Sequence, residues 1–414
     1  MLRRRVLLAH HFFHPDDVVS ARLFTDLALG LHERGWDVTV LTSDRSWSDP
    51  KKRHPEHEEL DSVHIERVHR PAWGQASPVE RLANSAWLLA AWTRRMAHLA
   101  PSDVVVLGSD PAFAPMAMVA WRRLWPRAAM VHWCYDVYPE VIVADGASAA
   151  VRAIVPLARR MMGEGYRRCD AIVDLGPGMR RHLAAYDTSA QRATIPPWAL
   201  VEPPGAPHPP DPRARQELFG GAQLGLLYSG TLGRAHDFSA LLELARACRL
   251  RSGDRIAFCF SCRGHRLPEL AASLRPDDTN VRTAPFCSED ALAIRLEAAD
   301  LHALSLQPAW AGLVVPSKFF GSLAVGRPLV YAGPVGSDIG EWIASFGVGY
   351  ELRTETASRT ADALHLLAES PEALLTLQRR AREVYDAEFS KSLGIAAWDR
   401  ILTSLVDRGA SRAG

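Results

Sequence analysis

The sequence predicts an α/β protein made of two doubly wound domains, and three observations lead to this prediction. Short apolar runs alternate with amphipathic segments along most of the chain, which is the pattern of parallel strands covered by helices. The alternation stops once, in the proline-rich stretch 201–212, and then starts again. A chain of 414 residues is also long for a single core, so about two domains are expected.

The proline-rich stretch sets the expected domain boundaries. We predict a first Rossmann-like domain over residues 1–200, a linker over 201–212 and a second such domain over 213–385. The remaining residues, 386–414, are expected to form helices that pack back on the first domain. Two such domains would face a cleft at the carboxyl ends of their strands, where open α/β sheets bind ligands.

The first domain opens with a strand–helix–strand unit. Leu23, Leu27 and Leu31 recur at helical spacing between two apolar runs, and Gly35 ends the helix. The fingerprint G-x-G-x-x-G is absent after the first strand, which argues against a classical dinucleotide site. Strands are expected at 5–11, 36–42, 63–70, 103–107, 128–133, 171–175 and 193–196, and helices at 21–34, 82–99, 115–125, 151–168 and 177–185.

The second domain repeats this alternation. The apolar runs here are short and bounded by glycine and proline, which is typical of buried parallel strands. Strands are expected at 224–229, 255–261, 281–284, 300–306 and 328–332, and helices at 238–249, 291–298, 318–325, 369–389 and 393–406.

Composition narrows the classes of function. A net charge of +1 gives no broad positive field, so no nucleic-acid partner is expected. No apolar run approaches 20 residues, and the run at 6–9 is too short for a signal peptide. The six cysteines are scattered through apolar segments, which favours reduced thiols in a cytoplasm. Cys259 and Cys262 fall on opposite faces of an expected strand, so no metal site is predicted there.

The stretch 312–328 contains a candidate phosphate site. Pro316 and Ser317 are typical of a helix start, where Ser317 would cap free backbone N–H groups. Lys318 then adds a full charge in the first turn, and Gly326 ends the helix. An ordinary strand–helix unit with a surface lysine fits the same pattern, so both interpretations stay open.

Two loops could complete a site with Lys318. Gly230 to His236 forms a glycine-containing loop after a strand, and its Arg234 could help Lys318 to hold a diphosphate. In the first domain, Asp136 follows the strand at 128–133. Its carboxylate could orient a hydroxyl group or assist proton transfer, or it could simply cap the next turn.

Aromatic and basic residues in the first domain suggest a possible peripheral membrane contact. Such a mixture can lie on an anionic leaflet, although tryptophans usually pack inside and arginines usually face solvent. The residues concerned are Trp87, Trp92, Arg94, Arg95, Trp121, Arg122, Arg123, Trp125 and Arg127.

Six motifs in the same order along nearly the whole chain resemble those of a known family. The chain is similar to family-4 glycosyltransferases of the GT-B fold, close to enzymes of bacterial capsule and exopolysaccharide synthesis. The motifs are HFFHPDDVVSARLFTDLALGLHERGWDVTVLTS, DVYPE, DAIVDLGPGMRRHL, IPPW, LLYSGTLGRAHDF and VVPSKFFGSLAVGRP.

This resemblance implies a reaction. A nucleotide-diphosphate sugar would bind the second domain, and its glycosyl group would pass, with retained configuration, to a saccharide or polyprenyl-linked acceptor on the first. Family members need no bound metal for the diphosphate, so no cofactor is expected. The implied setting is cytoplasmic, either free in solution or at the inner face of the cell membrane.

The resemblance also implies roles for individual residues. Lys318 and Arg234 would stabilise the leaving diphosphate, and Asp136 would face the transferred sugar. His14, Asp16 and Arg22 would contact the acceptor. The donor would contact Gly230, Thr231, Leu232, Gly233, His236, Gly264, Val315, Pro316, Ser317 and Gly321.

The sequence departs from the family pattern in two places. Many members carry two glutamates where this chain has Leu313 and Gly321, and a glycine pair where it has Val18 and Val19. We interpret this as a variant donor site. Two alternatives stay open: a nucleotide-sugar epimerase of the same architecture, and a non-catalytic partner of an active transferase.

Overall fold

The computed structural model describes residues 3–73, 78–288 and 290–413. It contains two compact units, each with its own sheet, and each is described here by itself. Unit 1 comprises residues 1–196 and 392–414, and unit 2 comprises residues 197–391. The chain therefore leaves unit 1 once and returns to it at Ser392.

The proline-rich stretch 201–212 belongs to unit 2, which differs from the expected linker between units. Residues of this stretch contact residues elsewhere in unit 2. Arg327 donates a hydrogen bond of 2.7 Å to the His208 carbonyl, and Pro207 packs so closely on Gly326 that a Cβ at residue 326 would lie 2.8 Å from it. These contacts hold the stretch against the unit that follows it.

Unit 1 is built around an eight-stranded sheet in the order β3-β4-β2-β1-β5-β6-β7-β8. All neighbouring strands run parallel except β3 and β4, which pair antiparallel at the edge. The strands are β1 Arg5–Ala9, β2 Asp37–Ser43, β3 His57–Leu60, β4 Val63–Val68, β5 Val104–Leu107, β6 Ala129–Trp133, β7 Ala171–Asp174 and β8 Gln191–Thr194.

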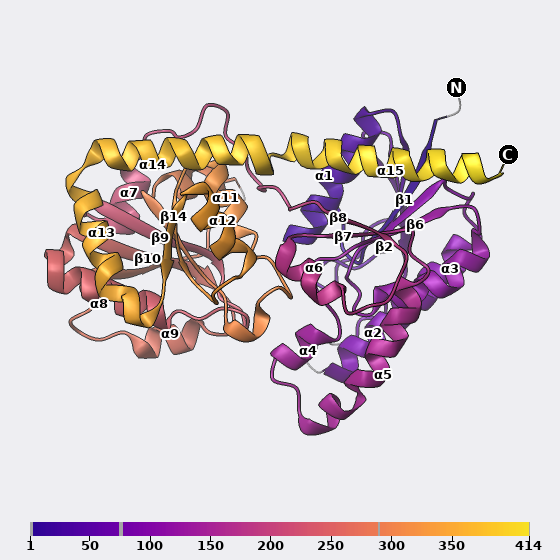
Figure 1. The fold of residues 1–414 in the computed structure, drawn as a ribbon, viewed down its shortest axis with the longest axis horizontal. Helices are drawn as coiled ribbons and strands as arrows, with labels where there is room; N and C mark the ends of the chain where they lie inside the picture. The colour runs from indigo at the N-terminus through magenta and orange to yellow at the C-terminus, as the bar shows by residue number, and fades with distance from the viewer. Residues whose placement is uncertain (1–2, 74–77, 289, 414) are drawn as a thin grey trace. The chain divides into compact units, whose positions relative to one another are not determined.

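Helices flank this sheet (Figure 1). The first, α1, keeps its predicted face, because Leu23, Leu27 and Leu31 are all buried. The helices of unit 1 are α1 Val19–Glu33, α2 Pro78–Met96, α3 Met118–Leu124, α4 Glu140–Ala144, α5 Ala149–Tyr166, α6 Pro177–Leu183 and, except for its first residue, α15 Lys391–Ala413.

The terminal helix α15 packs on α1 and the first sheet, and Figure 1 shows α1 and α15 side by side. The approach is close, since a Cβ at Gly30 would lie 2.5 Å from the Ile395 side chain. Trp36 donates a hydrogen bond of 2.8 Å to Asp399, and the rings of Trp133 and Trp398 lie 4.8 Å apart. Arg4 and Asp407 form an ion pair of 2.8 Å.

Unit 2 is built around a six-stranded, fully parallel sheet in the order β11-β10-β9-β12-β13-β14. Its central strands β9, β10 and β12 are almost wholly buried apolar runs, as expected for strands covered on both faces. The strands are β9 Leu224–Thr231, β10 Ile256–Arg263, β11 Val281–Ala284, β12 Leu301–Ser305, β13 Leu329–Ala332 and β14 Gly349–Leu352.

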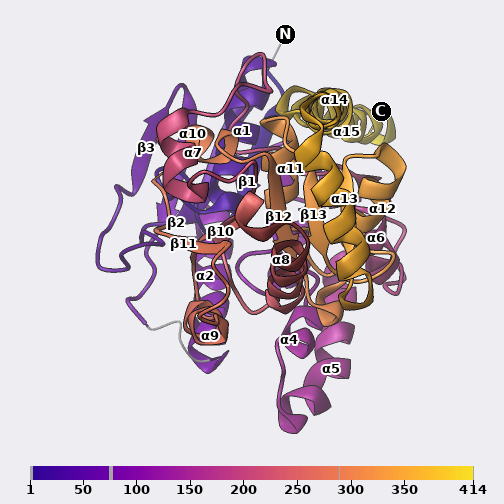
Figure 2. The same cartoon turned by 90° about the vertical axis from the view of Figure 1, so that its left-hand side faces the viewer.

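The core of unit 2 lies between this sheet and its helices, with α8 and α13 side by side (Figure 2). Its α14 ends in a π-helical turn, Tyr385–Phe389, before α15 begins. The helices are α7 Pro212–Phe219, α8 Ser239–Ser252, α9 Leu267–Ser273, α10 Leu292–Glu297, α11 Lys318–Ala324, α12 Asp338–Phe346, α13 Ala357–Glu369 and α14 Pro371–Val384.

The predicted fold class is confirmed, because the chain forms two α/β units with parallel sheets. Within the residues that the structure describes, no helix combines the length and apolar character needed to cross a membrane.

The predicted aromatic face on unit 1 is wrong for three of its four tryptophans: Trp92, Trp121 and Trp125 are buried and pack inside the unit.

Candidate functional site

Lys318 is the first residue of α11, and its side chain reaches the loop that follows β9 in unit 2. The ammonium donates a hydrogen bond of 3.1 Å to the Thr231 carbonyl and lies 3.4 Å from Nε2 of His236. It also lies 5.3 Å from the centre of the Tyr228 ring, a favourable place for a cation. The Lys318 side chain therefore connects the two segments predicted to form the site, 312–328 and 230–236.

The neighbouring His236 has a defined tautomer. Its Nδ1 is 2.6 Å from the Ser305 carbonyl, which can only accept, so Nδ1 carries the proton. The lone pair of Nε2 then faces the Lys318 ammonium. Burial and, to a smaller extent, the charge of Lys318 together lower the pKa of His236 to about 3. His236 is therefore a neutral neighbour of the lysine.

The charge of Lys318 has no carboxylate partner among the described residues. Lys318 is half-buried, and because burial removes water from the ammonium, it lowers the pKa of Lys318 to about 8. A poorly solvated cation held by one carbonyl and one neutral imidazole is favourably placed to receive an anion.

Two glycines make this close packing possible. Gly230 has φ +122°, and a Cβ there would lie 2.7 Å from Cε of Lys318. Gly264 has φ +127°, and a Cβ there would lie 2.6 Å from the Leu232 carbonyl oxygen. Side chains at either position would be strained and would push the two loops apart.

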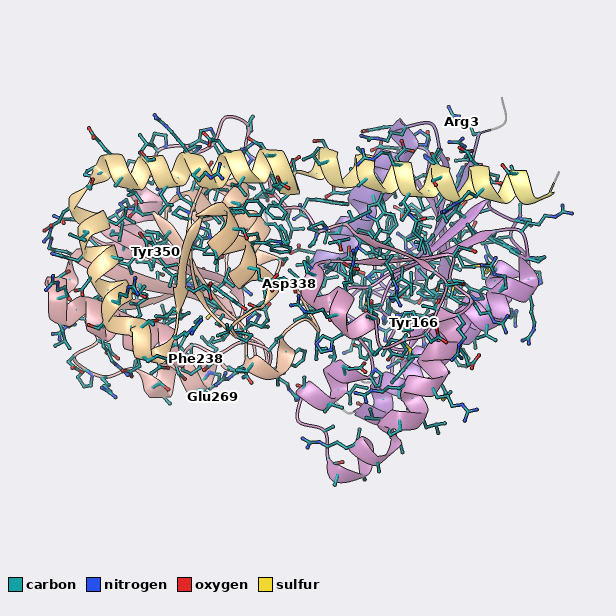
Figure 3. All side chains as sticks on the ribbon, viewed as in Figure 1. Arg3, Tyr166, Phe238, Glu269, Asp338 and Tyr350 are labelled. Atoms are coloured by element: carbon teal, nitrogen blue, oxygen red, sulfur yellow. The ribbon has the colours of Figure 1, made fainter. Side chains whose placement is uncertain are left out.

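Arg266, which was not predicted, holds the loop 230–236 in place. Its guanidinium donates to the His236 carbonyl and lies 5.0 Å from the Phe238 ring centre. It also pairs with Glu269 at 2.9 Å; Figure 3 labels Phe238 and Glu269, which lie near one another. The only signal in the sequence is a basic residue shortly after β10, which is too common to identify a role.

The remaining predicted donor residues have mixed environments. Arg234 is exposed on the same loop, whereas Lys318 is half-buried. The Gly233 carbonyl accepts a hydrogen bond of 3.1 Å from the backbone of His236, which closes the turn. Val315 and Pro316 are buried just before α11.

The predicted cap at Ser317 is wrong. Ser317 has helical backbone angles, φ −63° and ψ −19°, and its side chain makes no capping hydrogen bond. A capping residue normally has an extended backbone, which lets its hydroxyl turn back to the helix. Gly326 does end the helix as predicted, with φ +66°.

Gly321 is one of the two positions where the sequence departs from the glutamates of the resembled family. A Cβ at Gly321 would lie 3.8 Å from the Leu296 side chain, an ordinary contact, so the position has an apolar neighbour.

In unit 1, the ends of β1, β5 and β6 bring polar residues together. The Ser109 hydroxyl accepts hydrogen bonds from the backbone of Tyr135, at 2.8 Å, and of Asp136, at 3.3 Å. Burial, with a smaller effect from Asp110, raises the pKa of Asp136 to about 7. A carboxyl group with such a pKa can exchange protons near neutral pH.

Asp110 is paired with His11, and neither residue was predicted. His11 Nδ1 lies 3.1 Å from the Asp110 carboxylate. Burial alone would raise the pKa of Asp110, but the charge and hydrogen bond of His11 outweigh it and lower that pKa. The two neighbouring carboxyl groups, Asp110 and Asp136, are therefore driven toward opposite protonation states.

Arg70, just after β4, is a buried cation with unused donors. It is 1% exposed, and its Nε and Nη1 have no hydrogen-bond partner within the described chain. Burial lowers the pKa of Arg70, while Asp110, Asp44 and Asp16 act in the opposite direction.

The three predicted acceptor residues lie on or after the loop that follows β1. Asp16 is buried, and its Oδ1 accepts hydrogen bonds from the Ser46 hydroxyl, at 2.9 Å, and the Trp47 backbone, at 2.8 Å. The His14 carbonyl accepts a hydrogen bond of 2.7 Å from Arg67, and Arg22 is half-buried in α1. Asp16 and His14 thus help to shape the loop that carries them.

Comparisons with known proteins agree with this architecture. Residues 20–198 match the family model described as a glycosyl transferase 4-like domain. The probable glycosyltransferase WbjE of Pseudomonas aeruginosa is 25% identical over 262 residues, which is 60% of this chain and 62% of that relative.

Solved structures share the fold. Sucrose-phosphate synthase from Thermosynechococcus elongatus superposes with a TM-score of 0.71 at 14% identity, covering 98% of this chain and 100% of the other. WaaG, a glycosyltransferase involved in lipopolysaccharide biosynthesis, gives 0.63 at 16% identity, covering 96% and 99%. HepE from Anabaena, solved in complex with UDP, gives 0.65 at 13% identity, covering 97% and 100%.

The two parallel-sheet units share the GT-B fold with these solved structures. Residues 20–198 therefore resemble a glycosyl transferase 4-like domain, and the chain is similar to a probable glycosyltransferase.

Proposed function

We propose that this protein transfers a glycosyl group from a nucleoside-diphosphate sugar to a saccharide or lipid-linked saccharide acceptor. The proposal includes retention of the anomeric configuration, independence of a metal ion and a role in cell-surface polysaccharide synthesis. WaaG is involved in lipopolysaccharide biosynthesis and HepE has been solved in complex with UDP, and both facts support the substrate class.

The observation that carries the proposal is the unneutralised ammonium of Lys318. It is held against a glycine loop at the carboxyl end of a parallel strand, where α/β sheets bind nucleotides. When the glycosyl bond breaks, negative charge develops on the diphosphate, and a fixed cation there lowers the barrier. Arg234, exposed on the same loop, would add a second charge.

In unit 1, we assign the acceptor to the edge that holds Asp136. Its carboxyl group titrates near neutral pH and lies next to the ionised Asp110. Asp136 would orient the attacking hydroxyl or accept its proton, while His14, Asp16 and Arg22 shape the surrounding loop.

A panel of nucleoside diphosphates and nucleotide sugars tests the donor assignment. The correct nucleotide should raise the melting temperature, and the matching sugar should be transferred in the presence of a metal chelator. Lys318→Ala should reduce turnover about 10²–10³-fold, as is usual when one preorganised donor is lost.

The outcomes of this panel separate the alternatives. An epimerised nucleotide sugar formed without acceptor would favour the epimerase. Binding without turnover over any acceptor would favour the non-catalytic partner. Unchanged turnover in both Lys318→Ala and Arg234→Ala would remove the cationic loop from the mechanism.

We also propose that unit 1 contacts anionic membranes through α5. Ile154, Leu157 and Met161 lie on one face of this helix and are 60%, 61% and 41% exposed. Arg152 and Arg160 are exposed beside them, and Figure 1 shows α5 next to α4. An apolar stripe bordered by arginines matches the chemistry of an anionic leaflet.

Sedimentation with phosphatidylglycerol vesicles at low salt tests this contact. Leu157→Glu should reduce the bound fraction severalfold, because it places a negative charge in the stripe. Leu366→Glu is the matched control, since Leu366 is 64% exposed on α13 of unit 2. An equal loss in both variants, or no binding by the unmodified protein, would reject the contact.

A further inference from the structure

Unit 1 contains a cavity that is lined by none of the residues assigned above to the donor or the acceptor. Its volume is about 640 Å³, and it lies between α2 and the segments that follow β2 and β4. A cavity of this size is large enough for a monosaccharide and a charged substituent.

One face of α2 forms a wall of this cavity. Trp87, Ala90, Ala91 and Arg94 recur at helical spacing along it, and His98 continues the same face. The two alanines leave the space that larger side chains would fill. Trp87 is anchored by a hydrogen bond of 3.0 Å from its indole N–H to the His69 carbonyl, so its half-exposed ring has a fixed position.

The polar groups of the cavity are mostly hydrogen-bond donors. Four arginines line it against two carboxylates, Asp44 and Glu56. Asp44 is already occupied, since it accepts hydrogen bonds of 2.7 Å from Arg53 and 2.9 Å from the backbone of Arg70. Glu56 pairs with Arg95 at 3.3 Å.

Two donors of the cavity are unused. The guanidinium of Arg94 is exposed and has no hydrogen bond or ion pair among the described residues. Nε2 of His54 is buried and has no hydrogen-bond partner there either. Unpartnered cationic and imidazole nitrogens favour a ligand that brings acceptor oxygens, above all an anionic one.

We infer that this cavity binds an anionic sugar, one that carries a carboxylate or a phosphate group. The sugar ring lies against Trp87, and its anionic group is held by Arg94 and His54. The cavity is a subsite for an acidic residue of the acceptor, an assignment that rests on the proposed transfer. The binding itself does not depend on that transfer.

Titration calorimetry with glucuronate, glucose 6-phosphate and glucose measures this binding. The preferred anionic sugar should bind at least about tenfold more tightly than glucose, a difference that one well-placed cation can supply. Which of the two anions binds more tightly identifies the substituent.

Variants locate the site. Arg94→Ala and Trp87→Ala should each weaken binding of the anionic sugar about tenfold, with no loss of melting temperature for Arg94→Ala. Arg123→Ala is the matched control, because Arg123 is an exposed arginine of α3 in the same unit with no bonded partner in the described chain. It should leave the affinity unchanged within about twofold.

Three results would overturn the inference: no binding of either anionic sugar at millimolar concentration, equal binding of glucose, or equal losses in Arg94→Ala and Arg123→Ala. Displacement of the sugar by UDP would also overturn it, because the ligand would then occupy the donor site of unit 2. Since only binding is measured, an inactive protein that still binds the sugar would refute the transfer and leave the subsite intact.

Discussion

In the proposed donor site, the ionisation of Lys318 would decide how strongly its loop attracts a diphosphate. Because its pKa is about 8, the ammonium is charged at neutral pH and loses its proton above that value. Bound diphosphate favours the charged form and raises this pKa, so binding takes up protons above about pH 8. Affinity for the nucleoside diphosphate should therefore fall between pH 7.5 and 9.

Lys318→Arg tests this pH dependence, since a guanidinium keeps its charge throughout the range. Calorimetric titration of both proteins should show a decline with pH for the native protein and a nearly flat profile for Lys318→Arg. The same decline in both would mean that another group controls the binding.

Asp136 allows a test on stability that does not depend on activity. Its pKa is about 7 in the folded protein and about 3.9 when unfolded, so the folded state binds more protons between these values. The contribution of the Asp136 carboxyl to the free energy of unfolding is therefore lost as the pH rises from about 4 to about 7, and it does not change at higher pH. Asn resembles the protonated carboxyl and does not titrate.

The melting temperature of Asp136→Asn relative to the native protein should thus increase with pH up to about 7 and then level off. Thermal unfolding at pH 5, 6, 7 and 8 measures this difference. A constant difference across that range would show that the Asp136 carboxyl is ionised at pH 5 in the folded protein.

The sequence could predict residues whose role depends on their local segment. Lys318 and Gly230 stand out because a helix start and a strand end are visible in the chain itself. Arg266 and Arg70 could not be found in this way, because their surroundings come from distant parts of the sequence: Arg266 donates to the His236 carbonyl, and Arg70 is buried near Asp110 and Asp16. The missed cap at Ser317 has a similar cause, since the pattern does not reveal its helical backbone angles.

At the level of elements, the packing of α15 on α1 depends on one small residue. Ala at position 30 would gain up to about 1 kcal/mol in helix propensity, but its Cβ would lie 2.5 Å from Ile395. We expect Gly30→Ala to cost about 1–3 kcal/mol in the unfolding free energy of unit 1, as overpacking usually does.

A double-mutant cycle in urea checks this contact. Gly30→Ala should cost less when Ile395 is already Ala, because the clash is then absent. Gly409→Ala, also in a helix but with nothing within 4 Å of its Cβ, should instead be neutral or slightly stabilising. Equal costs of Gly30→Ala in both backgrounds would contradict the predicted clash.

Predicted elements agree best with the structure where the hydrophobic pattern is strong. The buried strand expected at 300–306 is β12, Leu301–Ser305, and α1 differs by two residues at its start and one at its end. In unit 2, α7, α9, α12, α13 and β14 were missed, and in unit 1, β3 and α4. β3 is an exposed, polar edge strand that exists only by pairing with β4, and α4 is a single short turn without a buried residue.

For the whole molecule, two separate cores predict two thermal transitions. A nucleoside diphosphate that binds unit 2 should raise the melting temperature of that unit only. At a ligand concentration of 100 Kd, the free energy of unfolding of unit 2 should increase by about 2.7 kcal/mol. Differential scanning calorimetry measures both transitions, and Gly30→Ala identifies that of unit 1 by lowering it. A ligand that shifts only the unit 1 transition would contradict the donor assignment.

The return of the chain to unit 1 at Ser392 also has a consequence for biosynthesis. On the ribosome, all eight strands of the first sheet emerge before residue 197, yet the helix that covers Trp133 emerges only after the whole of unit 2. For that interval α1 alone covers this side of the nascent sheet, so the apolar surface around Trp133 is only partly covered and chaperones can bind it. Slow elongation through unit 2 should therefore lengthen the time during which the newly made protein can aggregate.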